Sequence, residues 1–518
     1  MTVNYLNTGN SSIEFKQTID NPNYVDKSML INGISHNIRI RDNKYICITR
    51  PRRFGKTINA NMLAAYYTKG YDSHELFDDL KVAKTENYEK HMNKYNVIYI
   101  DFSILPDPCD SYQQYISWIK SALINDLQVM YYIDHIDNAP ISHTLIQTND
   151  SFIFVLDEWD SIFYKDFMSE KDKMNYLQFL KGLLKDQAYV DLVYMTGVLP
   201  IAKYSSGSEL NMFDEFNFMN DNIYDQYFGF TEEEVKKLCQ IHSKPTYEEL
   251  QYWYNGYYLS NGNHLFNPRS VNKALMRGIC QNYWTETGPM NEIADCIEHN
   301  VDEVREDIVN LVAGNAIEVQ LDGYSVTQLQ LDTRDEILSA MVVFGFLSYY
   351  DGYLTIPNYE LMQKYNRVLS RESMGGVKKI VDQSKAMLEA TINQDEEKVA
   401  EILESVHDQE IPFLNYNDEN SLSCVITLCY LYARNDYDIT REDRSGKGYV
   451  DYLFIPKKKH KPAIVLELKY NKSVKEALEQ IKKKNYIDKV KDYQEILLVG
   501  INYDGKKHHE CMIEKMTK

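Results

Sequence analysis

The stretch YICITRPRRFGKTINANML, residues 45–63, decides the fold of the N-terminal part of the chain. It opens with a short apolar run, YICIT, and closes with residues that favour a helix. Between the two stands Gly55-Lys56-Thr57, the triplet with which a phosphate-binding loop enters its helix. A lysine here reaches β- and γ-phosphates, a threonine hydroxyl binds Mg²⁺, and the first helix amides point at phosphate. The stretch therefore predicts a strand, a phosphate loop and a helix.

The loop departs from the usual glycine-rich pattern at its start. Arg50 stands where that pattern has its first glycine, and Pro51 removes one amide donor. Taken alone, the GKT triplet is also compatible with a chance match in a basic loop, because only the full pattern is specific. The residues expected to contact a nucleotide are Arg52, Arg53, Phe54, Gly55, Lys56, Thr57, Asp157 and Thr196.

Continuous apolar runs at 45–49, 96–102, 152–158 and 192–198 predict the strands of one sheet. Helical patterns separate them, and strands buried on both faces are typical of a doubly wound parallel sheet. Ligands of such sheets bind beyond the carboxyl ends of the strands. Those ends carry Thr49, Asp101, Asp157, Glu158 and Thr196.

The acids that end the third run suit a nucleotide-hydrolysing site. In phosphate-loop enzymes an aspartate at this place holds the Mg²⁺ shell, which predicts that role for Asp157 together with Thr57. Glu158 is then suited to orient or deprotonate the attacking water. Thr196 stands where a polar group would contact the γ-phosphate. The alternatives are an ordinary buried strand capped by charged loop residues and, for Thr196, a plain strand-end turn.

The pattern changes to helices after about Phe230. Near 335–360 a helix precedes a hairpin with an Asp351-Gly352 turn, an order typical of winged-helix folds. The acidic helical stretch 392–406 is the expected boundary region before the last module. The expected domains are a P-loop ATPase domain at 1–240, a helical or winged-helix-like domain at 241–375, and a nuclease-like domain at 376–518.

The C-terminal region reads as an α-β-β-β-α-β module. Its expected elements are a helix at 419–435, strands at 437–443, 449–456 and 463–470, a helix at 473–486, and a last strand at 495–503.

Three charged residues of this module suit phosphodiester hydrolysis, which needs carboxylates to hold Mg²⁺ and a cation near the reacting phosphate. Asp451 lies in the second strand. Glu467 and Lys469 lie two apart in the next strand, so they leave the same face. Charges in such an apolar strand are costly without a purpose. The alternative is a salt-bridge cluster on an exposed sheet face.

Charge is distributed unevenly along the chain. The net charge is −20, but residues 441–518 hold 19 Lys and Arg against 12 Asp and Glu, a net of +7, and the preceding residues carry −27. The runs KKKHK (457–461) and KKK (482–484) could contact a phosphate backbone, which favours nucleic acid, DNA first, as a partner. A solvated lysine-rich surface explains the charge equally well.

The sequence also argues against several classes of protein, namely membrane-spanning, secreted and cysteine-based metal-binding proteins. No apolar run reaches the roughly 18–20 residues of a membrane span, and no signal-peptide pattern is present. None of the eight cysteines forms a CxxC pair, and HHEC (508–511) is a weak metal candidate. We expect an intracellular, cytoplasmic protein without a membrane partner. Its oligomeric state is left open.

Six segments together resemble the AAA-ATPase-like family whose members commonly carry a C-terminal PD-(D/E)XK nuclease domain. In order along the chain they are YVDKSMLI (24–31), RPRRFGKT (50–57), VLDEWD (155–160), TGVLPIAK (196–203), YFGFTEEEV (227–235) and WYNGYYL with FNPRSV (253–271).

The resemblance implies that the arginine-rich loop is the family's normal P-loop. It also implies that Glu419, on the first helix of the nuclease module, assists the metal site and that Gln480 lies near the scissile group. The chain departs from the family at Arg269, where an aromatic is usual, and at SSGSELNM (205–212). Both departures fall outside the expected nucleotide core.

The expected fold is α/β: a P-loop NTPase sheet, a helical middle and a restriction-endonuclease-like module. The expected function is ATP binding and hydrolysis with Mg²⁺, coupled to metal-dependent DNA cleavage. The expected metal ligands are Thr57 and Asp157 in one site and Asp451 and Glu467 in the other. The alternative is a nucleotide-dependent switch or scaffold whose C-terminal module binds a partner without cleaving it. A winged-helix DNA contact in the middle is compatible with either.

Overall fold

The chain divides into two compact units in the computed structural model. The first comprises Met1–Cys296 and Glu318–Glu360, and the second Ile297–Ile317 and Leu361–Lys518. This division differs from the three expected domain ranges, which stay a prediction. The structure describes residues 3–133, 139–201, 209–219, 221–284, 302–312, 314–319, 333–369, 376–408, 425–445, 448–457, 461–484, 486–504 and 508–517.

A five-stranded parallel sheet in the order β2-β3-β4-β1-β5 forms the centre of the first unit. The four predicted strands are confirmed, and β4 lies between β1 and β3. The short β5 has no counterpart in the sequence prediction, because three residues carry no periodic signal. The strands are β1 (Tyr45–Thr49), β2 (Asn96–Asp101), β3 (Phe152–Asp157), β4 (Val190–Gly197) and β5 (Asp214–Phe216).

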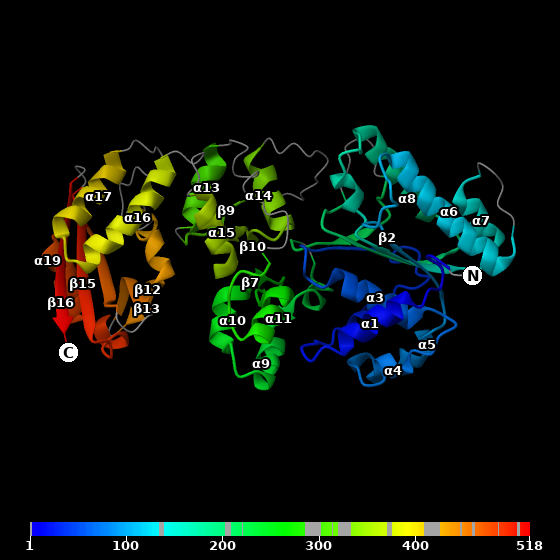
Figure 1. Cartoon of the computed structure of the whole chain (residues 1–518), viewed down its shortest axis with the longest axis horizontal. Coiled ribbons are helices and arrows are strands. Elements are labelled where there is room, and N and C mark those ends of the chain that lie inside the picture. The colour runs from blue at the N-terminus through cyan, green and yellow to red at the C-terminus, as the bar shows by residue number, and fades with distance from the viewer. Residues whose placement is uncertain are drawn as a thin grey trace. The chain divides into compact units, whose positions relative to one another are not determined.

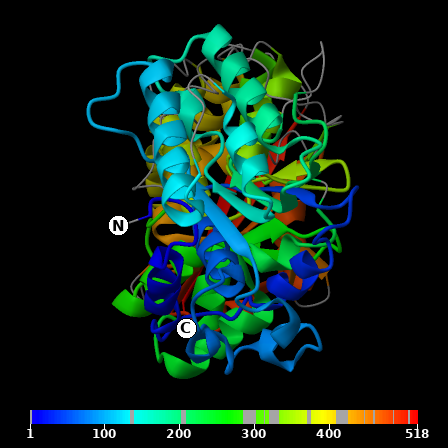
Figure 2. The ribbon, with the colours of Figure 1, turned by 90° about the vertical axis from the view of Figure 1, so that its right-hand side faces the viewer.

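Alternate strand residues supply two separate cores, one on each face of the sheet. Tyr45 and Cys47 pack with the helices of one face, whereas Ile46 and Ile48 pack with those of the other. Figures 1 and 2 show the sheet between these two helix layers. One layer contains α6 (Tyr112–Tyr131), α7 (Ile141–Gln147) and α8 (Glu170–Leu184). The other contains α1 (Asn10–Ile19), α2 (Met29–Ser35), α3 (Lys56–Tyr67), α4 (His74–Phe77), η1 (Lys81–Lys84) and α5 (Tyr88–His91).

The turn from β1 into α3 depends on a glycine. Gly55 is the N-cap of α3 and has a φ of +91°, in the left-handed region that other residues rarely adopt. No side chain caps α3, so its first amides stay available to a ligand. The 50–55 loop and the start of α3 therefore lie at the carboxyl edge of the sheet.

The rest of the first unit is mainly helical. A buried carboxylate, that of Glu360, holds part of it together, since it accepts hydrogen bonds from Ser270 Oγ at 2.7 Å and from the amides of Tyr283 and Trp284 at 2.6 and 2.7 Å. The elements are η2 (Ser161–Tyr164), η3 (Asp225–Tyr227), β6 (Phe230–Thr231), α9 (Glu232–Ile241), α10 (Tyr247–Tyr254), β7 (Asn255–Tyr258), β8 (His264–Phe266), α11 (Pro268–Arg277), α14 (Arg334–Val343), β10 (Ser348–Tyr350) and β11 (Tyr353–Thr355).

The predicted helix and hairpin are present as α14, β10 and β11. The two strands pair antiparallel, and the turn residues Asp351 and Gly352 have φ values of +48° and +85°. Positive φ at both central residues is typical of a tight two-residue hairpin turn.

A mixed sheet in the order β12-β13-β14-β15-β16 forms the core of the second unit. Only β14 and β15 run parallel, and the other neighbours are antiparallel. The elements of this unit and of its junctions are α13 (Asp302–Val312), β9 (Ile317–Glu318), α15 (Tyr359–Leu369), α16 (Gly376–Ile392), α17 (Glu396–Asp408), η6 (Leu431–Asn435), β12 (Tyr437–Ser445), β13 (Gly448–Pro456), β14 (Ala463–Tyr470), α19 (Val474–Lys483), η7 (Tyr486–Lys489), β15 (Glu495–Tyr503) and β16 (His509–Thr517).

The strand at 495–503 is not the last one, contrary to the sequence prediction. β16 pairs antiparallel with β15 along its whole length and ends the sheet. Its sequence, HECMIEKMT, mixes charged and apolar residues because it is a half-exposed edge strand, so its hydrophobic signal is weak. Residues 419–424 of the expected first helix lie outside the described residues, and 425–429 are helical.

Among the helices that the structure describes, none combines the length and the apolar composition that crossing a bilayer requires.

Candidate functional site

The carboxyl ends of four neighbouring strands bring the predicted polar residues together. Asp101 of β2 lies in register with Asp157 of β3, and Thr196 of β4 lies in register with Ile48 of β1. Thr49 then ends β1, and the 50–55 loop follows. The predicted group thus forms one cluster at one edge of the sheet, together with Asp101, which the sequence analysis lists as a strand end without assigning it a role.

Asp157 is fully buried at the centre of this cluster. Its Oδ1 accepts a hydrogen bond from the Glu158 amide at 3.0 Å. Within the described part of the chain, its Oδ2 has no hydrogen-bond partner, and the same holds for Thr49 Oγ1 and Thr196 Oγ1. Burial and the nearby charges of Glu158 and Asp101 raise the pKa of Asp157 to about 7. The Thr57 hydroxyl and the Lys56 ammonium offset this rise only in part, so a cation bound at Asp157 would further stabilise its ionised form.

Lys56 lies beside these oxygens and is almost fully buried. Its Nζ donates to the carbonyl oxygens of Arg50 at 3.1 Å and Pro51 at 3.2 Å, and lies 3.7 Å from Glu158 Oε1. Two backbone carbonyls of the 50–55 loop thus hold the Lys56 ammonium group against that loop. A phosphate group entering the loop would compete with neutral carbonyls for this charge, and a phosphate oxygen is the stronger acceptor.

Glu158 has a backbone conformation that is uncommon for its residue type. Its φ is +51°, which places it in the left-handed region immediately after a buried strand. The exposed fraction of the Glu158 side chain is 27%. A carboxylate that is partly open to water, adjacent to Asp157 and near Lys56, can orient or deprotonate a water molecule.

Arg50 is directed away from the nucleotide side and into the protein. Its Nη1 donates to the carbonyls of Thr49 at 2.7 Å and Phe216 at 2.9 Å, and its Nη2 pairs with buried Asp221. Its guanidinium carbon also lies 5.3 and 5.1 Å from the ring centres of Phe218 and Phe228. The residue that replaces the first glycine of the loop therefore connects the end of β1 to β5 and to the segment after it.

The other two arginines of the loop are less buried. Arg52 lies 5.8 Å above the ring of Tyr164. Arg53 is exposed and has a φ of +74°. Partial burial, followed by the charges of Arg269 and Arg52, lowers the pKa of Arg53. Arg269 of α11, which the sequence analysis places outside the nucleotide core, thus lies within electrostatic reach of the loop. Nothing in the chain order indicates this proximity.

Asp160 positions the strand end that carries Thr196, a role that its place in the sequence does not predict. Its buried carboxylate accepts from the amides of Val198 at 3.1 Å and Leu199 at 2.9 Å. A Cβ on Gly197 would lie 2.3 Å from Asp160 Oδ1, so only glycine fits here.

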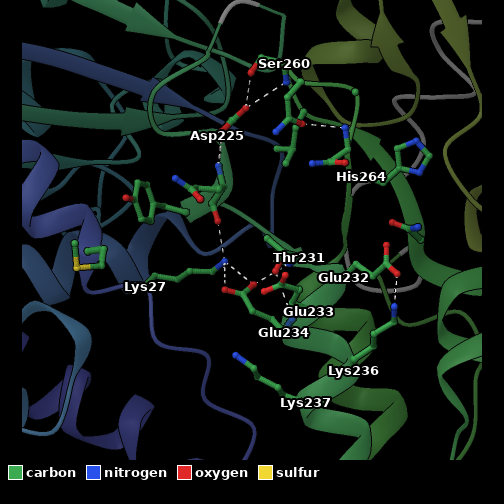
Figure 3. Close-up of a pocket in the computed structure, with 18 of the residues that line it drawn as sticks. Lys27, Asp225, Thr231, Glu232, Glu233, Glu234, Lys236, Lys237, Ser260 and His264 are labelled. Carbon is green, nitrogen blue, oxygen red and sulfur yellow. Dashed lines mark hydrogen bonds and ion pairs between the residues drawn. The ribbon is translucent and has the colours of Figure 1, made fainter.

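Two cavities of the first unit are large enough to hold a small molecule. One, of about 360 Å³, has Phe54, Gly55 and Ile58 in its wall. The other, of about 1110 Å³, is lined by acids and lysines of the α9 region (Figure 3), and no residue of 50–57 lines it. In the larger cavity Lys27 is occupied, since it donates to the Gln226 carbonyl at 2.8 Å and to Glu234 at 2.7 and 2.8 Å. The larger cavity is therefore not a phosphate site of the 50–57 loop.

The predicted triad of the second unit also comes together. Lys469 Nζ lies 2.9 Å from Glu467 Oε1 and donates to the Leu468 carbonyl at 2.8 Å. Asp451 Oδ2 accepts from the Leu468 amide at 2.6 Å, which brings β13 and β14 together at this point. Gln480 of α19 donates to Glu467 Oε1. The cluster is buried at Glu467 and Lys469, so the alternative of an exposed surface cluster is wrong.

Glu467 resembles Asp157 in its electrostatics. Burial and the charge of Asp451 raise its pKa to about 7, although Lys469 lies beside it. Its Oε2 is buried without a hydrogen-bond partner in the described part of the chain. A divalent cation shared by Glu467 and Asp451 would satisfy this oxygen and remove the repulsion between the two carboxylates.

Two further predictions of metal ligands, Glu419 and HHEC, have different outcomes. Glu419 lies outside the described residues. Residues 509–511 of HHEC pair with β15, with Cys511 opposite Ile501, and the ring of His509 stacks on that of Tyr503 at 4.9 Å. Across the described ranges, no group of three or more His, Cys, Asp or Glu side chains is arranged to hold a metal ion. Each carboxylate pair would have to complete its metal shell with other oxygens, such as those of water or substrate.

Some solved structures are similar to the chain at low identity. The Walker-type ATPase PABY2304 of Pyrococcus abyssi is 10% identical, with 66% of this chain and 97% of that chain covered and a TM-score of 0.35. The ORC2 protein of Aeropyrum pernix, in its ADPNP–ADP complexes, is 11% identical, with 70% and 93% covered and a TM-score of 0.28. No curated protein matches the chain.

Two family models match separate parts of the chain. Residues 13–206, which contain the sheet and the 50–57 loop, match the predicted AAA-ATPase family model. Residues 417–513, which contain Asp451, Glu467 and Lys469, match the PD-(D/E)XK nuclease superfamily model. The chain thus combines an AAA-ATPase-like domain with the fold of a P-loop NTPase and a C-terminal domain of the PD-(D/E)XK nuclease superfamily.

Proposed function

We propose that the first unit binds and hydrolyses ATP with Mg²⁺ at the edge of the sheet beside α3. The observation that carries this is the set of buried, unpartnered oxygens of Asp157, Thr49 and Thr196 next to the Lys56 ammonium. Leaving a buried polar atom without a partner costs about 1–3 kcal/mol, so such a cluster is expected where a ligand completes it.

Each residue of the cluster has a separate role in this proposal. Lys56 holds the β- and γ-phosphates, and the first amides of α3 and the Arg53 guanidinium add to the positive field. Thr57 and Asp157 would hold Mg²⁺, which supplies charge neutralisation at the phosphates. Glu158 orients or deprotonates the attacking water, and Thr196 donates its hydroxyl to the γ-phosphate. Arg52 is a further candidate for a phosphate contact.

The test separates binding from turnover in the full-length protein. Lys56→Ala should weaken ATP binding by tenfold or more, roughly the loss of one charge-assisted contact. Glu158→Gln should keep the affinity and lower turnover by a factor of about 10² or more. Lys69→Ala, which removes a partly exposed lysine beyond the other end of α3, is the matched control and should change neither. Equal turnover in wild type and Glu158→Gln would remove the proposed role of this residue.

We further propose that the C-terminal domain cleaves DNA in a metal-dependent reaction. The support is the buried Glu467 carboxylate, with one oxygen unpartnered, between Asp451 and Lys469. Asp451 and Glu467 would hold Mg²⁺, which supplies a polarised phosphate and an activated water. Lys469 stabilises charge at the reacting phosphate, and Gln480 orients Glu467. Glu419 keeps its predicted role in assisting the metal.

Cleavage is measured on supercoiled DNA, single-stranded DNA and RNA, with Mg²⁺ or Mn²⁺ and with EDTA. Lys469→Ala should abolish metal-dependent cleavage, whereas Lys472→Ala, an exposed lysine three residues later, should leave it unchanged. If wild type and Lys469→Ala behave alike on every substrate, the nuclease proposal fails.

ATP is proposed to control the nuclease. Adding ATP should then change the cleavage rate of wild type but not that of Lys56→Ala. A wild-type protein that binds ATP yet cleaves neither ATP nor nucleic acid would instead support the alternative, a nucleotide-dependent switch or scaffold.

A further inference from the structure

The helix α19 covers the face of the second sheet on which Glu467 lies. Leu478 and Ile481 of this helix pack there in one core with Val465 of β14 and Leu498 of β15. Glu467 follows Val465 by two residues, so its side chain leaves the same face of β14. The position of α19 therefore determines what reaches this buried carboxylate.

Gln480 is the residue through which α19 contacts the carboxylate. Its Nε2 donates a hydrogen bond to Glu467 Oε1, the same oxygen that lies 2.9 Å from Lys469 Nζ. Glu467 Oε2 is buried and, within the described ranges, has no hydrogen-bond partner. Two donors on one oxygen thus fix the orientation of the carboxylate and leave its second oxygen for a cation.

The distance between α19 and the sheet depends on a glycine. Gly500 of β15 is in register with Glu467, and α19 packs directly against it. A Cβ on Gly500 would lie 2.8 Å from the carbonyl oxygen of Val474 and 3.0 Å from Ala477 Cβ. The first of these contacts is with helix backbone, so only a movement of α19 would relieve it. The φ of Gly500 lies outside the left-handed region, so space and not backbone conformation requires this glycine.

The close contact at Gly500 is passed on to Gln480. Ala477 and Gln480 are three residues apart in α19 and therefore lie on the same face of the helix. The backbone hydrogen bonds of an α-helix make it move as one element. A displacement of α19 at Ala477 would therefore withdraw Gln480 from Glu467, and a hydrogen bond weakens steeply as its atoms separate.

Asn502 positions the segment that leads into α19. It is the next residue of β15 on the face of Gly500, in register with Lys469, and it is 2% exposed. Its Oδ1 accepts a hydrogen bond from the Lys472 amide at 3.0 Å. The N-cap of α19, Ser473, follows immediately. β15 thus holds both the entry into the helix and the distance of the helix from the sheet.

We propose that Gly500 and Asn502 are positioning residues of the metal site in the C-terminal domain. They hold α19 where Gln480 orients the Glu467 carboxylate toward a divalent cation. The inference rests on the proposed metal site of the nuclease. Gly500 has no side chain, and Asn502 Oδ1 is occupied by a backbone amide, so both are assigned a role through α19.

The test measures Mn²⁺ binding to the full-length protein by isothermal titration calorimetry, without nucleotide. Glu467→Gln identifies the heat that belongs to this site, because it removes a proposed ligand. Gly500→Ala should weaken that binding roughly tenfold or more, as the loss of support for a metal ligand does. Ile501→Val, which removes a methyl group on the opposite face of β15, is the matched control and should leave the affinity within about twofold.

Cleavage of DNA separates a positioning role from a loss of folded protein. In Gly500→Ala, a raised Mn²⁺ concentration should restore the cleavage rate to within about threefold of wild type, because the carboxylates are still present. A rate that stays low at every Mn²⁺ concentration, in protein that melts as a folded chain, contradicts the proposal.

Asn502→Ala tests the same role without adding bulk, so it also serves where Gly500→Ala does not fold. It removes the acceptor of the Lys472 amide and should weaken Mn²⁺ binding by roughly tenfold as well.

A double variant shows whether Gly500 acts through Gln480. Gln480→Ala alone should weaken Mn²⁺ binding as Gly500→Ala does, and the double variant should be no weaker than either single variant. Losses that add, or unchanged Mn²⁺ affinity in Gly500→Ala and Asn502→Ala, overturn this inference while the metal site stands. Unchanged Mn²⁺ binding in Glu467→Gln overturns the metal site itself, and this inference with it.

Discussion

Arg50 illustrates how one residue can replace another by a different physical means. A glycine at the start of a phosphate loop supplies conformational freedom and leaves room for the ligand. Arg50 instead occupies a fully buried place, where it pairs with Asp221 and donates to the carbonyls of Thr49 and Phe216. The beginning of this loop is therefore held by a side chain. The cost is a buried charge that requires its partner.

We expect Arg50→Met to destabilise the protein strongly. The substitution leaves Asp221 buried without its cation, which costs about 3–5 kcal/mol in comparable buried pairs. Urea unfolding followed by tryptophan fluorescence measures the loss. The double variant Arg50→Met with Asp221→Leu should recover part of it, and Arg41→Met, at an exposed arginine, is the control. If the double variant is as unstable as the sum of the single variants, the pair carries no coupling.

Glu467 should make stability depend on pH when divalent metal is absent. Its folded pKa of about 7 lies above the ordinary value of 4.5, so the ionised carboxylate is unfavourable in the folded state. This cost is absent below about pH 4.5, grows between about pH 4.5 and 7, and reaches about 3 kcal/mol above that range. In EDTA, Glu467→Gln should therefore melt at a higher temperature than wild type at pH 8, and this advantage should vanish near pH 4. An equal advantage at both pH values contradicts the assignment.

At the scale of elements, the site depends on how strand ends are held. β3 and β4 end in register, and Asp160, just after β3, accepts from the amides of Val198 and Leu199 that follow β4. Gly197 leaves the space through which this carboxylate passes. Thr196, in β4, is thereby fixed relative to Asp157 by contacts between elements.

We expect Gly197→Ala to lower both stability and ATP turnover. The new methyl group would lie 2.3 Å from Asp160 Oδ1 and 2.5 Å from Trp159 Cδ1, so buried groups must move, at a cost of about 1–3 kcal/mol. Gly182→Ala is the control. A methyl group there meets nothing within 4 Å on α8, and it should be neutral or stabilising by up to about 1 kcal/mol. Thermal melting and phosphate release measure the two effects, and equal behaviour of the two variants would contradict the expectation.

At the scale of the whole molecule, charge is distributed unevenly along the chain. Residues 441–518 carry a net charge of +7, and the preceding residues carry −27. A polyanion should therefore meet attraction at residues 441–518 and repulsion elsewhere.

DNA binding should accordingly fall steeply with salt. Neutralising several phosphates with lysine or arginine predicts a loss of about 10³-fold or more between about 50 and 200 mM salt. Fluorescence anisotropy with a labelled duplex, in EDTA to prevent cleavage, gives the slope. Replacing the exposed Lys483 and Lys484 by Gln should reduce it, whereas the same change at Lys120 and Lys171 should not. If the salt dependence of DNA binding is the same after replacement of Lys483 and Lys484, these two lysines are not part of the DNA-binding surface.

The sequence by itself determined the strands of the first sheet, the order of the C-terminal module and the identity of most proposed site residues. These features rest on local signals: continuous apolar runs, a loop entering a helix, and charges placed in a buried strand. β5 and β16 were not predicted, because neither has a clear periodic pattern. β5 is too short for one, and β16 is too polar.

Only the tertiary structure decided what the arginines do and which distant segments enclose the cavity beside the 50–57 loop. Buried Arg50 pairs with Asp221, which lies far along the chain. Arg269 comes within electrostatic reach of Arg53. The cavity beside the 50–57 loop is lined by segments more than a hundred residues apart. Each of these depends on burial and on contacts between distant segments. A chain pattern specifies which residues are buried on an element, but not which other element covers them.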